Sequence, residues 1–331
     1  MEQELKNKKI LITGGAGSIG TALIKEFLKY NVDTIRVLDI SENEIHKLRN
    51  NFIGETRMRY LIGDVRDLNR LKLAMEDIDI VVHLAAMKHV HVCEYNPFEA
   101  VKTNVDGLQN VINCSKNENV EKVIFTSTDK AAHPLSVMGM TKLMGEKLIS
   151  SADFYKGSKK TLFASVRFGN VIGSNGSVMP LFKRQILNGE PIKINDKEMT
   201  RFVITMDEAV KLICKAVELV RGGETFVWKM KTLKITDLAD SMMSKYANGK
   251  EIKVNVAEKE EGEKIHEEIM SDEELSRAVE LDNLYIIFPM VDQKSVRSKY
   301  QEAKPIADPV IASNMGVHLS KEEISKLLDI C

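Results

Sequence analysis

A short apolar strand that runs straight into a group of glycines most constrains what this chain can fold into. The strand KKILIT at 8–13 leads into GGAGSIG and then into TALIKEFLKY, whose apolar residues recur at helical spacing. Glycines in this position let the backbone turn tightly, let phosphates approach the helix N-terminus and let the helix pack closely on the strand. The segment therefore predicts the first unit of a dinucleotide-binding Rossmann-like fold. The residues expected at the cofactor are Gly14, Gly15, Gly17, Ser18, Ile19 and Gly20.

Acidic residues follow the next two expected strands. The strand at 34–39 ends in Asp39, 19 residues after Gly20. A carboxylate there accepts hydrogen bonds from an adenosine ribose and repels a 2′-phosphate, so we expect NAD, with NADP as the second choice. Asp64 and Val65 lie in GDVRD after the strand at 58–62 and are placed to meet the adenine. The alternative for Asp64 is an ordinary turn residue.

The rhythm of apolar segments indicates the fold class. Short, continuously apolar strands alternate with amphipathic helices over the first 170 residues, which is typical of βαβ units on a parallel sheet covered on both faces. We predict an α/β protein: a Rossmann-like doubly wound parallel sheet with a smaller C-terminal α/β substrate lobe. The dinucleotide-binding domain is expected at 1–170, with sheet and helix returns from the later chain, and the mainly substrate-binding lobe at 171–331.

The expected elements can be given by range. Strands are predicted at 8–13, 34–39, 58–62, 79–83, 121–127 and 161–167, and helices at 18–30, 97–117 and 139–155. After residue 170 the pattern is less regular, with helices near 180–188 and 206–220 and isolated strands near 192, 203, 226 and 252. Taken alone, the charged stretch 257–268 is typical of a solvated loop and helix.

Composition excludes several classes of function. The 331 residues contain 47 Lys plus Arg and 48 Asp plus Glu, a net charge of -1, which disfavours a general nucleic-acid binder. No stretch approaches the ~20 apolar residues of a membrane span, and the N-terminus lacks a signal-peptide pattern. We therefore expect a cytoplasmic protein with no membrane partner. The four cysteines, without CxxC spacing, are expected to be reduced and mostly buried.

The residues after the fourth strand, HLAAMKHVHVCE, should lie where open α/β sheets bind ligands. Ala85 and Ala86 are small enough for a dinucleotide to lie close, and Lys88 and His89 are candidates for the substrate wall. On an extended strand, His89, His91 and Cys93 would share one face. They are not interpreted as a metal site, because no further ligand or supporting shell can be identified.

The fifth strand is followed by Thr128, Asp129 and Lys130, and Lys142 comes twelve residues later. An acid beside an amine at the end of a strand suggests proton transfer in both directions. Asp129 and Lys130 can share a site only if the strand has already ended, because neighbouring strand residues point to opposite faces. The alternative is a surface turn.

These segments together resemble the extended short-chain dehydrogenase/reductase superfamily, and within it the nucleotide-sugar 4,6-dehydratases of the CapD-like polysaccharide-biosynthesis family. The resemblance covers nearly the whole chain. It rests on TGGAGSIG (13–20), GDVRD (63–67), HLAAMKHVHVCEYNPFEAVKTNV (83–105), STDKAAHPLSVMGMTK (127–142), RFGNVIGSNGSVMPLF (167–182), TRF (200–202) and GEKIHEE (262–268). It implies UDP-N-acetylglucosamine as substrate, a tightly held nicotinamide cofactor and a 4-keto-6-deoxy product.

The resemblance also implies a mechanism. Oxidation at C4 of the sugar acidifies the C5 proton, water leaves from C5 and C6, and the hydride returns to C6. Thr128 would hydrogen-bond the C4 oxygen, Asp129 would be the general acid at O6 and Lys130 the base at C5. A neutral Lys130 requires a protonated Asp129, so the two are expected to titrate as a pair. Lys142 matches the lysine at the nicotinamide ribose, whereas Met138 replaces the usual tyrosine; Lys142 or a water is the expected base at the C4 hydroxyl.

Further contacts follow from the same resemblance. Cofactor contacts are implied for Val65, Ala85, Ala86, Lys88, Asn104 and Lys142. Substrate contacts are implied for Lys88, His89, Asn170, Ser177, Arg201, Lys229, Lys264 and Glu267. Relatives commonly have an arginine two residues before the glycine of GEK, where this chain has Glu260 beside Lys259.

Two other functions stay open. A nucleotide-sugar 4-epimerase uses the same C4 oxidation but needs no acid and base aimed at C6 and C5. A catalytically silent NAD-binding scaffold is compatible with the absence of the tyrosine. Relatives pair through the helices that correspond to 97–117 and 139–155, so the resemblance implies a homo-oligomer.

Overall fold

The first half of the chain forms the parallel sheet that the sequence predicts. The computed structural model describes residues 1–174, 177–257 and 262–329. All six strands predicted before residue 170 are present. They are β1 (Lys9–Thr13), β2 (Thr34–Asp39), β3 (Met58–Ile62), β4 (Ile80–His83), β5 (Lys122–Thr126) and β6 (Leu162–Arg167).

The later chain returns to this sheet. Across the described residues the sheet has nine strands in the order β13-β14-β10-β6-β5-β4-β1-β2-β3. β10 (Thr225–Trp228) adds in parallel to β6, and β14 (Leu284–Ile287) and β13 (Ala278–Leu281) close that edge as an antiparallel pair. The strand near 226, expected to be isolated, is therefore part of the main sheet, because its backbone pairs with Ser165–Arg167 of β6.

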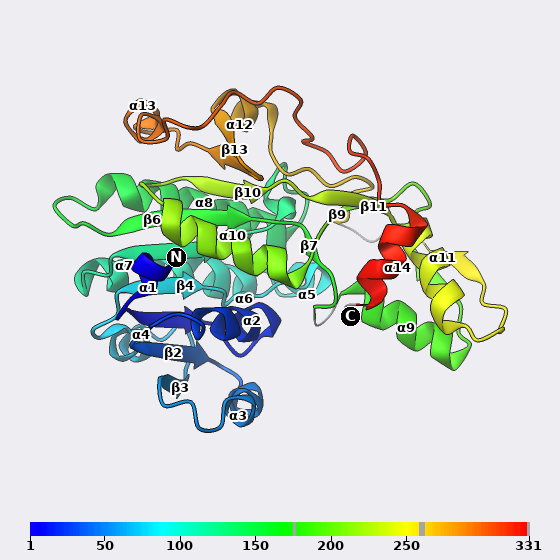
Figure 1. The fold of residues 1–331 in the computed structure, drawn as a ribbon, viewed down its shortest axis with the longest axis horizontal. Helices are drawn as coiled ribbons and strands as arrows, with labels where there is room; N and C mark the ends of the chain where they lie inside the picture. Colours follow the sequence, from blue (N-terminus) through cyan, green and yellow to red (C-terminus); the bar gives the residue numbers. More distant parts are fainter. Residues whose placement is uncertain (175–176, 258–261, 330–331) are drawn as a thin grey trace.

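Helices cover both faces of the sheet (Figure 1). The core on one face is shared by α2 (Ser18–Phe27), α3 (Glu42–Asn51) and α10 (Met206–Leu219). The core on the other face is shared by α4 (Leu68–Met75), α7 (Gly107–Asn117) and α8 (Val137–Tyr155). Ile10 and Leu11 show why the strands are continuously apolar: they are neighbours in β1, point to opposite cores and are both fully buried.

Two segments after β4 differ from expectation. Residues 90–95 form a short helix, α5 (Val90–Tyr95), and not an extended strand. The helix predicted at 97–117 is present as α6 (Pro97–Val101) and α7, joined by one π-helical turn, η1 (Lys102–Asp106). A π-helical turn changes which residues of the helix face inward. Neither this turn nor the short helix α5 can be recognised from the spacing of apolar residues in the sequence.

The second lobe lies beyond one end of the sheet (Figure 1). It has a small sheet of β7 (Asn170–Val171), β9 (Thr200–Ile204) and β11 (Lys231–Lys234), and a pair of strands, β8 (Ile192–Ile194) and β12 (Val254–Val256). Its helices are α9 (Val178–Asn188), α11 (Ile235–Tyr246) and α14 (Lys321–Asp329). The lobe has a core of its own that includes Phe182, Ile194, Leu238 and Leu328.

The remaining elements are short. They are α1 (Glu2–Leu5), η2 (Asp129–Ala131), α12 (Asp272–Ser276) and α13 (Gln293–Arg297). The solvated helix expected within 257–268 is wrong for the described residues 262–268, which form no helix and bury Glu267. His266 bridges to Thr200 of β9, which places this segment beside the small sheet of the second lobe. Residues 258–261 lie outside the described chain.

Cys93, Cys114 and Cys214 are free and buried, as expected, and Cys331 lies outside the described residues. In the part of the chain that the structure describes, none of the helices has the length and apolar character that crossing a membrane requires.

Candidate active site

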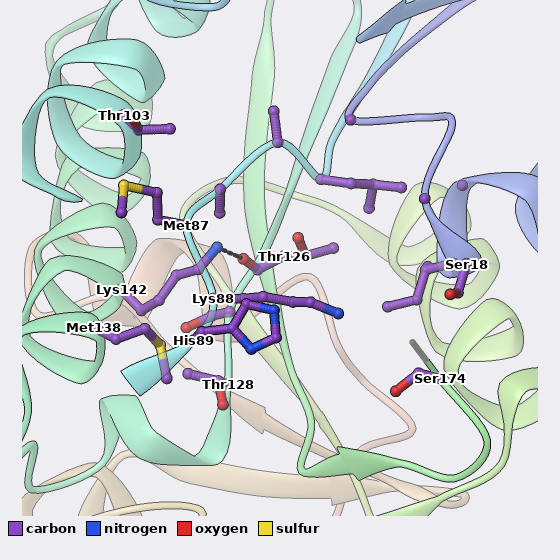
Figure 2. A pocket seen from close by; sticks show the side chains of 18 of the residues that line it. Ser18, Met87, Lys88, His89, Thr103, Thr126, Thr128, Met138, Lys142 and Ser174 are labelled. Carbon is purple, nitrogen blue, oxygen red and sulfur yellow. Dashed lines mark hydrogen bonds between the residues drawn. The ribbon is translucent and has the colours of Figure 1, made fainter. Parts of the chain in front are cut away.

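A large pocket lies where the carboxyl ends of β1, β4 and β5 face the second lobe. Its volume is about 890 Å³, enough for a dinucleotide together with part of a second ligand. Figure 2 shows Lys88 and His89 extending into it, with Met138 and Lys142 on one side and Ser174 on the other. The lining residues are Gly14, 17–20, 38–40, Glu44, 63–66, 84–91, Glu99, Thr103, 126–128, Lys130, Met138, Lys142, 168–171, Ser174, Ser177 and Glu263.

The glycine turn has the shape that a phosphate group requires. Gly14 has a φ of +65°, and a Cβ there would lie 2.6 Å from the backbone nitrogen of Ala85. A Cβ on Gly20 would overlap the backbone of Gly15. Gly17, the N-cap of α2, is different: a Cβ on it would meet only the carbonyl oxygen of Gly14, at 3.4 Å. Because protein packing does not require a glycine at 17, its open side fits a ligand that approaches the start of α2.

Asp39 and Asp64 lie on the pocket wall beyond the glycine turn. The Asp39 carboxylate accepts hydrogen bonds from the backbone N–H groups of Ala16 (3.1 Å) and Ser41 (3.0 Å), so it also holds the turn in place. Asp64 accepts a hydrogen bond of 2.7 Å from Arg66 Nε, and Arg66 Nη1 donates to Glu99 at 2.7 Å. Arg66 is a pocket residue that the sequence did not single out.

Asn104, which is expected among the cofactor contacts, bonds with protein groups in the structure. Its side chain is buried, and its carboxamide bonds with the backbone of Met87 at 2.8 and 3.0 Å and with Thr141 Oγ1 at 2.9 Å. It does not line the pocket. Asn104 therefore holds the 85–88 loop, of which Ala85, Ala86 and Lys88 do line the pocket, in position.

The acid and amine after β5 are close together, because the strand ends at Thr126 before they begin. Asp129 and Lys130 lie in the 3₁₀ turn η2, for which Thr128 is the N-cap. Lys130 Nζ is 3.1 Å from Asp129 Oδ1, and Thr128 Oγ1 donates to the same oxygen at 2.9 Å. Thr128 and Lys130 line the pocket, whereas Asp129 is fully buried behind them.

A second carboxylate reaches the same amine. Glu267 Oε1 lies 3.0 Å from Lys130 Nζ and 3.9 Å from Arg201 Nε. Full burial raises the pKa of Asp129, although Lys130 opposes this effect. Burial disfavours the charged form of Lys130, but the attraction of Asp129 and Glu267 outweighs it and raises the pKa of the amine. Burial also disfavours an ionised Glu267, yet Lys130 and Arg201 lower the pKa of that carboxyl.

The surroundings of Lys142 disfavour the charged form of its amine. Its Nζ donates to the carbonyl oxygen of Thr126 at 2.9 Å (Figure 2) and lies 4.8 Å from the centre of the Phe125 ring. Burial lowers the pKa of Lys142 to about 8, against the opposing charge of Glu146. Met138 lies one helical turn earlier, lines the pocket and packs against Cys93 and Ala100.

The expected substrate residues divide into two groups. Lys88, His89, Asn170 and Ser177 line the pocket, and the Oδ1 of Asn170 and the Oγ of Ser177 are buried without a hydrogen-bond partner among the described residues. Such orphaned polar atoms suit a polar ligand.

The second group does not line the pocket: Arg201, Lys229, Lys264 and Glu267. Arg201 donates to the carbonyl oxygens of Thr200 and Ile265 at 2.8 and 3.1 Å. Lys229 pairs with Glu280 of β13 at 2.9 Å, and Lys264 donates to the carbonyl oxygen of Ala132 at 2.7 Å. These three cations bond with protein groups, and a contact of any of them with the substrate stays a prediction.

The histidine and cysteine pattern after β4 also differs from expectation. Because 90–95 is helical, Cys93 points into the core and is fully buried, whereas His91 is exposed. His89 is the N-cap of α5, and its side chain makes no capping bond. Glu263 of the GEKIHEE motif lines the pocket, although the sequence did not single it out, and Asn195 donates to it at 2.6 Å. Lys259 and Glu260 lie outside the described residues.

The fold, the glycine turn and the reactive groups at the strand ends define an extended short-chain dehydrogenase/reductase. The chain belongs to the polysaccharide biosynthesis protein family, whose model matches residues 10–289. The Rossmann-like fold is shared with Pen from Bacillus thuringiensis, whose X-ray structure superposes with a TM-score of 0.92 at 40% identity, covering 99% of this chain and 98% of that one.

Several curated proteins are similar to this chain over most of its length. An uncharacterized membrane protein of Methanocaldococcus jannaschii is 45% identical over 98% of this chain and 96% of its own length. A UDP-N-acetylglucosamine 4,6-dehydratase (inverting) of Campylobacter jejuni is 42% identical, covering 87% of this chain and 86% of that one. A UDP-glucose 4-epimerase of Rickettsia bellii is 36% identical over 97% and 95%. The chain is thus an enzyme of the nucleotide-sugar dehydratase and epimerase group.

Proposed function

We propose that this protein is a UDP-N-acetylglucosamine 4,6-dehydratase that uses NAD. The observation that carries the proposal is the contact of Lys130 Nζ with Asp129 Oδ1 at 3.1 Å, just after β5, with Lys130 in the same pocket as the glycine turn. An epimerase has no need of an acid and a base beyond C4. The similarity to the Campylobacter jejuni dehydratase supports the same reaction.

The residues divide the proton transfers among them. Bound NAD would supply the hydride chemistry, accepting hydride from C4 and returning it to C6. Lys142, whose pKa of about 8 leaves part of it neutral near physiological pH, takes the proton of the C4 hydroxyl. Thr128 hydrogen-bonds the C4 oxygen, and Lys130 removes the C5 proton and later returns it.

Asp129 supplies the proton with which the C6 hydroxyl leaves as water. Burial raises the pKa of Asp129, which favours the protonated form that this role requires. Because it lies behind the pocket wall, its proton reaches O6 through Thr128 or Lys130, both of which contact its Oδ1. The proton released from the C4 hydroxyl restores the acid, so the protons balance over one turnover.

NAD is preferred over NADP on two grounds. The Asp39 carboxylate at the end of β2 lines the pocket where the adenosine ribose would lie. Arg66, a cation that lines the same pocket, is already paired with Asp64 and Glu99. The two carboxylates leave little positive charge for a phosphate.

Incubation of the purified protein with NAD and UDP-N-acetylglucosamine, followed by NMR of the product, tests the function. A 4-keto-6-deoxy sugar is expected. A C4 epimer would identify the epimerase, which the similarity to the Rickettsia bellii enzyme favours as second candidate. Recovery of unchanged substrate, with NAD binding retained, would identify a silent scaffold.

Homo-oligomerisation and a cytoplasmic location stay predictions. Apolar side chains that are more than half exposed lie on the two helical segments expected to pair: Phe98, Met140, Met144 and Phe154. A second copy of the chain would cover this surface.

A further inference from the structure

Glu267 lies at the reactive amine although its segment is remote in sequence. The side chain is 2% exposed. Its backbone N–H donates to Ser313 Oγ at 2.9 Å, and its backbone carbonyl accepts from the Ser313 N–H at 2.8 Å. Ser313 is fully buried and is in turn hydrogen-bonded to Thr200 Oγ1 at 2.6 Å. These bonds fix the backbone of Glu267 at a position from which its buried side chain contacts Lys130.

The contacts of the carboxylate are those of a proton acceptor and not of a substrate ligand. Oε1 faces Lys130 Nζ at 3.0 Å and Arg201 Nε at 3.9 Å. Oε2 is buried without a hydrogen-bond partner among the described residues. Glu267 does not line the pocket, so the sugar would meet Lys130 and not Glu267.

The charges around Lys130 leave one group to receive its proton. The amine contacts two carboxylates, of which Asp129 must already be protonated if it is the acid at O6. Arg201 and Lys264 add positive charge near Glu267 and favour its ionised form. One oxygen of each carboxylate is buried without a partner among the described residues, so with Asp129 protonated it is Glu267 that remains to accept the proton of Lys130.

We propose, resting on the dehydratase function above, that Glu267 is a positioning residue that accepts the ammonium proton of Lys130 when the sugar excludes water from the site. One N–H bond of Lys130 breaks and an O–H bond forms on Glu267, which leaves a neutral amine. The lone pair of that amine then takes the C5 proton while the electrons of the C–H bond move toward C4. After Lys130 has returned this proton to C5, Glu267 returns its own to Lys130.

The test compares Glu267→Gln, Glu267→Asp and Glu268→Gln in the full chain with NAD bound. Glu268 is the matched control, because it pairs with His133 and Lys264 and does not contact Lys130. The readouts are the transient of reduced cofactor, which reports C4 oxidation, and the exchange of the C5 hydrogen with D₂O, each from pH 6 to about 10.

Glu267→Gln is expected to keep the reduced-cofactor transient but to slow C5 exchange about 100-fold at neutral pH. The exchange rate should then rise about tenfold per pH unit, because Lys130 must release its proton to solvent. Glu267→Asp should restore the shape of the wild-type profile at a lower rate, and Glu268→Gln should behave as wild type.

Two outcomes would overturn the proposal. One is a wild-type rate of C5 exchange in Glu267→Gln. The other is a loss of exchange rate in Glu267→Gln that is equal at every pH and is also seen in Glu267→Asp. Failure of the wild-type protein to form any 4-keto-6-deoxy product would instead reject the dehydratase function itself. The two failures are therefore distinguishable.

Discussion

The ammonium group of Lys142 donates a hydrogen bond to the carbonyl oxygen of Thr126 at 2.9 Å, which fixes the amine at the end of β5. Burial lowers the pKa of this lysine to about 8. A base must be neutral to accept a proton, so the rate of C4 oxidation should rise with pH through about 8 and then level off. Stopped-flow absorbance of the reduced cofactor across pH measures this limb.

Lys142→Arg should remove the limb, because arginine stays charged at all these pH values. The matched control is Lys147→Arg on the exposed side of the same helix. A rate that shows no dependence on pH between 6 and 9 in the wild type would contradict the role of Lys142 as the base.

Met138→Tyr should move the pH limb of C4 oxidation to lower pH. Met138 is one turn before Lys142 and lines the pocket. A phenol there would therefore lie beside the Lys142 amine and act as a second acceptor for the proton of the C4 hydroxyl. The control is Met140→Tyr, since that side chain is 53% exposed. If Met138→Tyr leaves the profile unchanged, the absence of a tyrosine has no bearing on proton transfer.

Lys130→Met and Asp129→Asn should separate dehydration from oxidation. Each removes one proton-transfer group and is expected to lower product formation by about 10²–10⁴-fold. The reduced-cofactor transient should remain, because neither side chain acts at the C4 hydroxyl. Quantitative NMR of product alongside the transient checks this, and a parallel loss of both signals would argue that the variants have lost the site as a whole.

Gly14→Ala and Gly17→Ala should differ in what they damage. Gly14 has a φ of +65° and no room for a Cβ, so alanine is expected to cost about 1–3 kcal/mol of stability. Gly17 has room on the protein side, so alanine there should leave the melting temperature unchanged while weakening NAD binding. Thermal unfolding and calorimetric titration distinguish the two variants. A large loss of stability in Gly17→Ala would contradict the interpretation that Gly17 leaves room for a ligand phosphate at the start of α2.

Met144→Arg should shift the protein to a smaller assembly without unfolding it. Met144 is 51% exposed on α8, and a charge there would be buried if two copies paired through this helix. Mass photometry at several concentrations measures the change. Glu118, at the exposed end of α7, offers Glu118→Arg as a control on general charge effects.

The structure confirms what local sequence patterns can encode. The six early strands and the glycine turn before α2 lie where the sequence predicts them. A continuously apolar strand or a glycine-specific turn depends only on residues that are close in sequence. The close approach of Asp129 and Lys130 also agrees with expectation, since their spacing and the end of the strand are local.

Predictions from the sequence differed from the structure where a segment contacts residues that are distant in the sequence. Residues 90–95 are helical because α5 packs on α8 through the cluster of Cys93 and Met138, and nothing in HVHVCE alone favours that geometry. Arg201 and Lys229 have the residue types of phosphate ligands, but backbone carbonyls and Glu280 satisfy them.

The sequence by itself therefore determined the class of fold and the residue types at the strand ends. Only the tertiary structure decided which charges neutralise one another. Glu267 reaches Lys130, and Asn104 turns to Met87, because the packing of the sheet and second lobe sets distances that no local spacing contains. The strength of each ion pair and the pKa of each ionisable group depend on those distances and on the exclusion of water by burial.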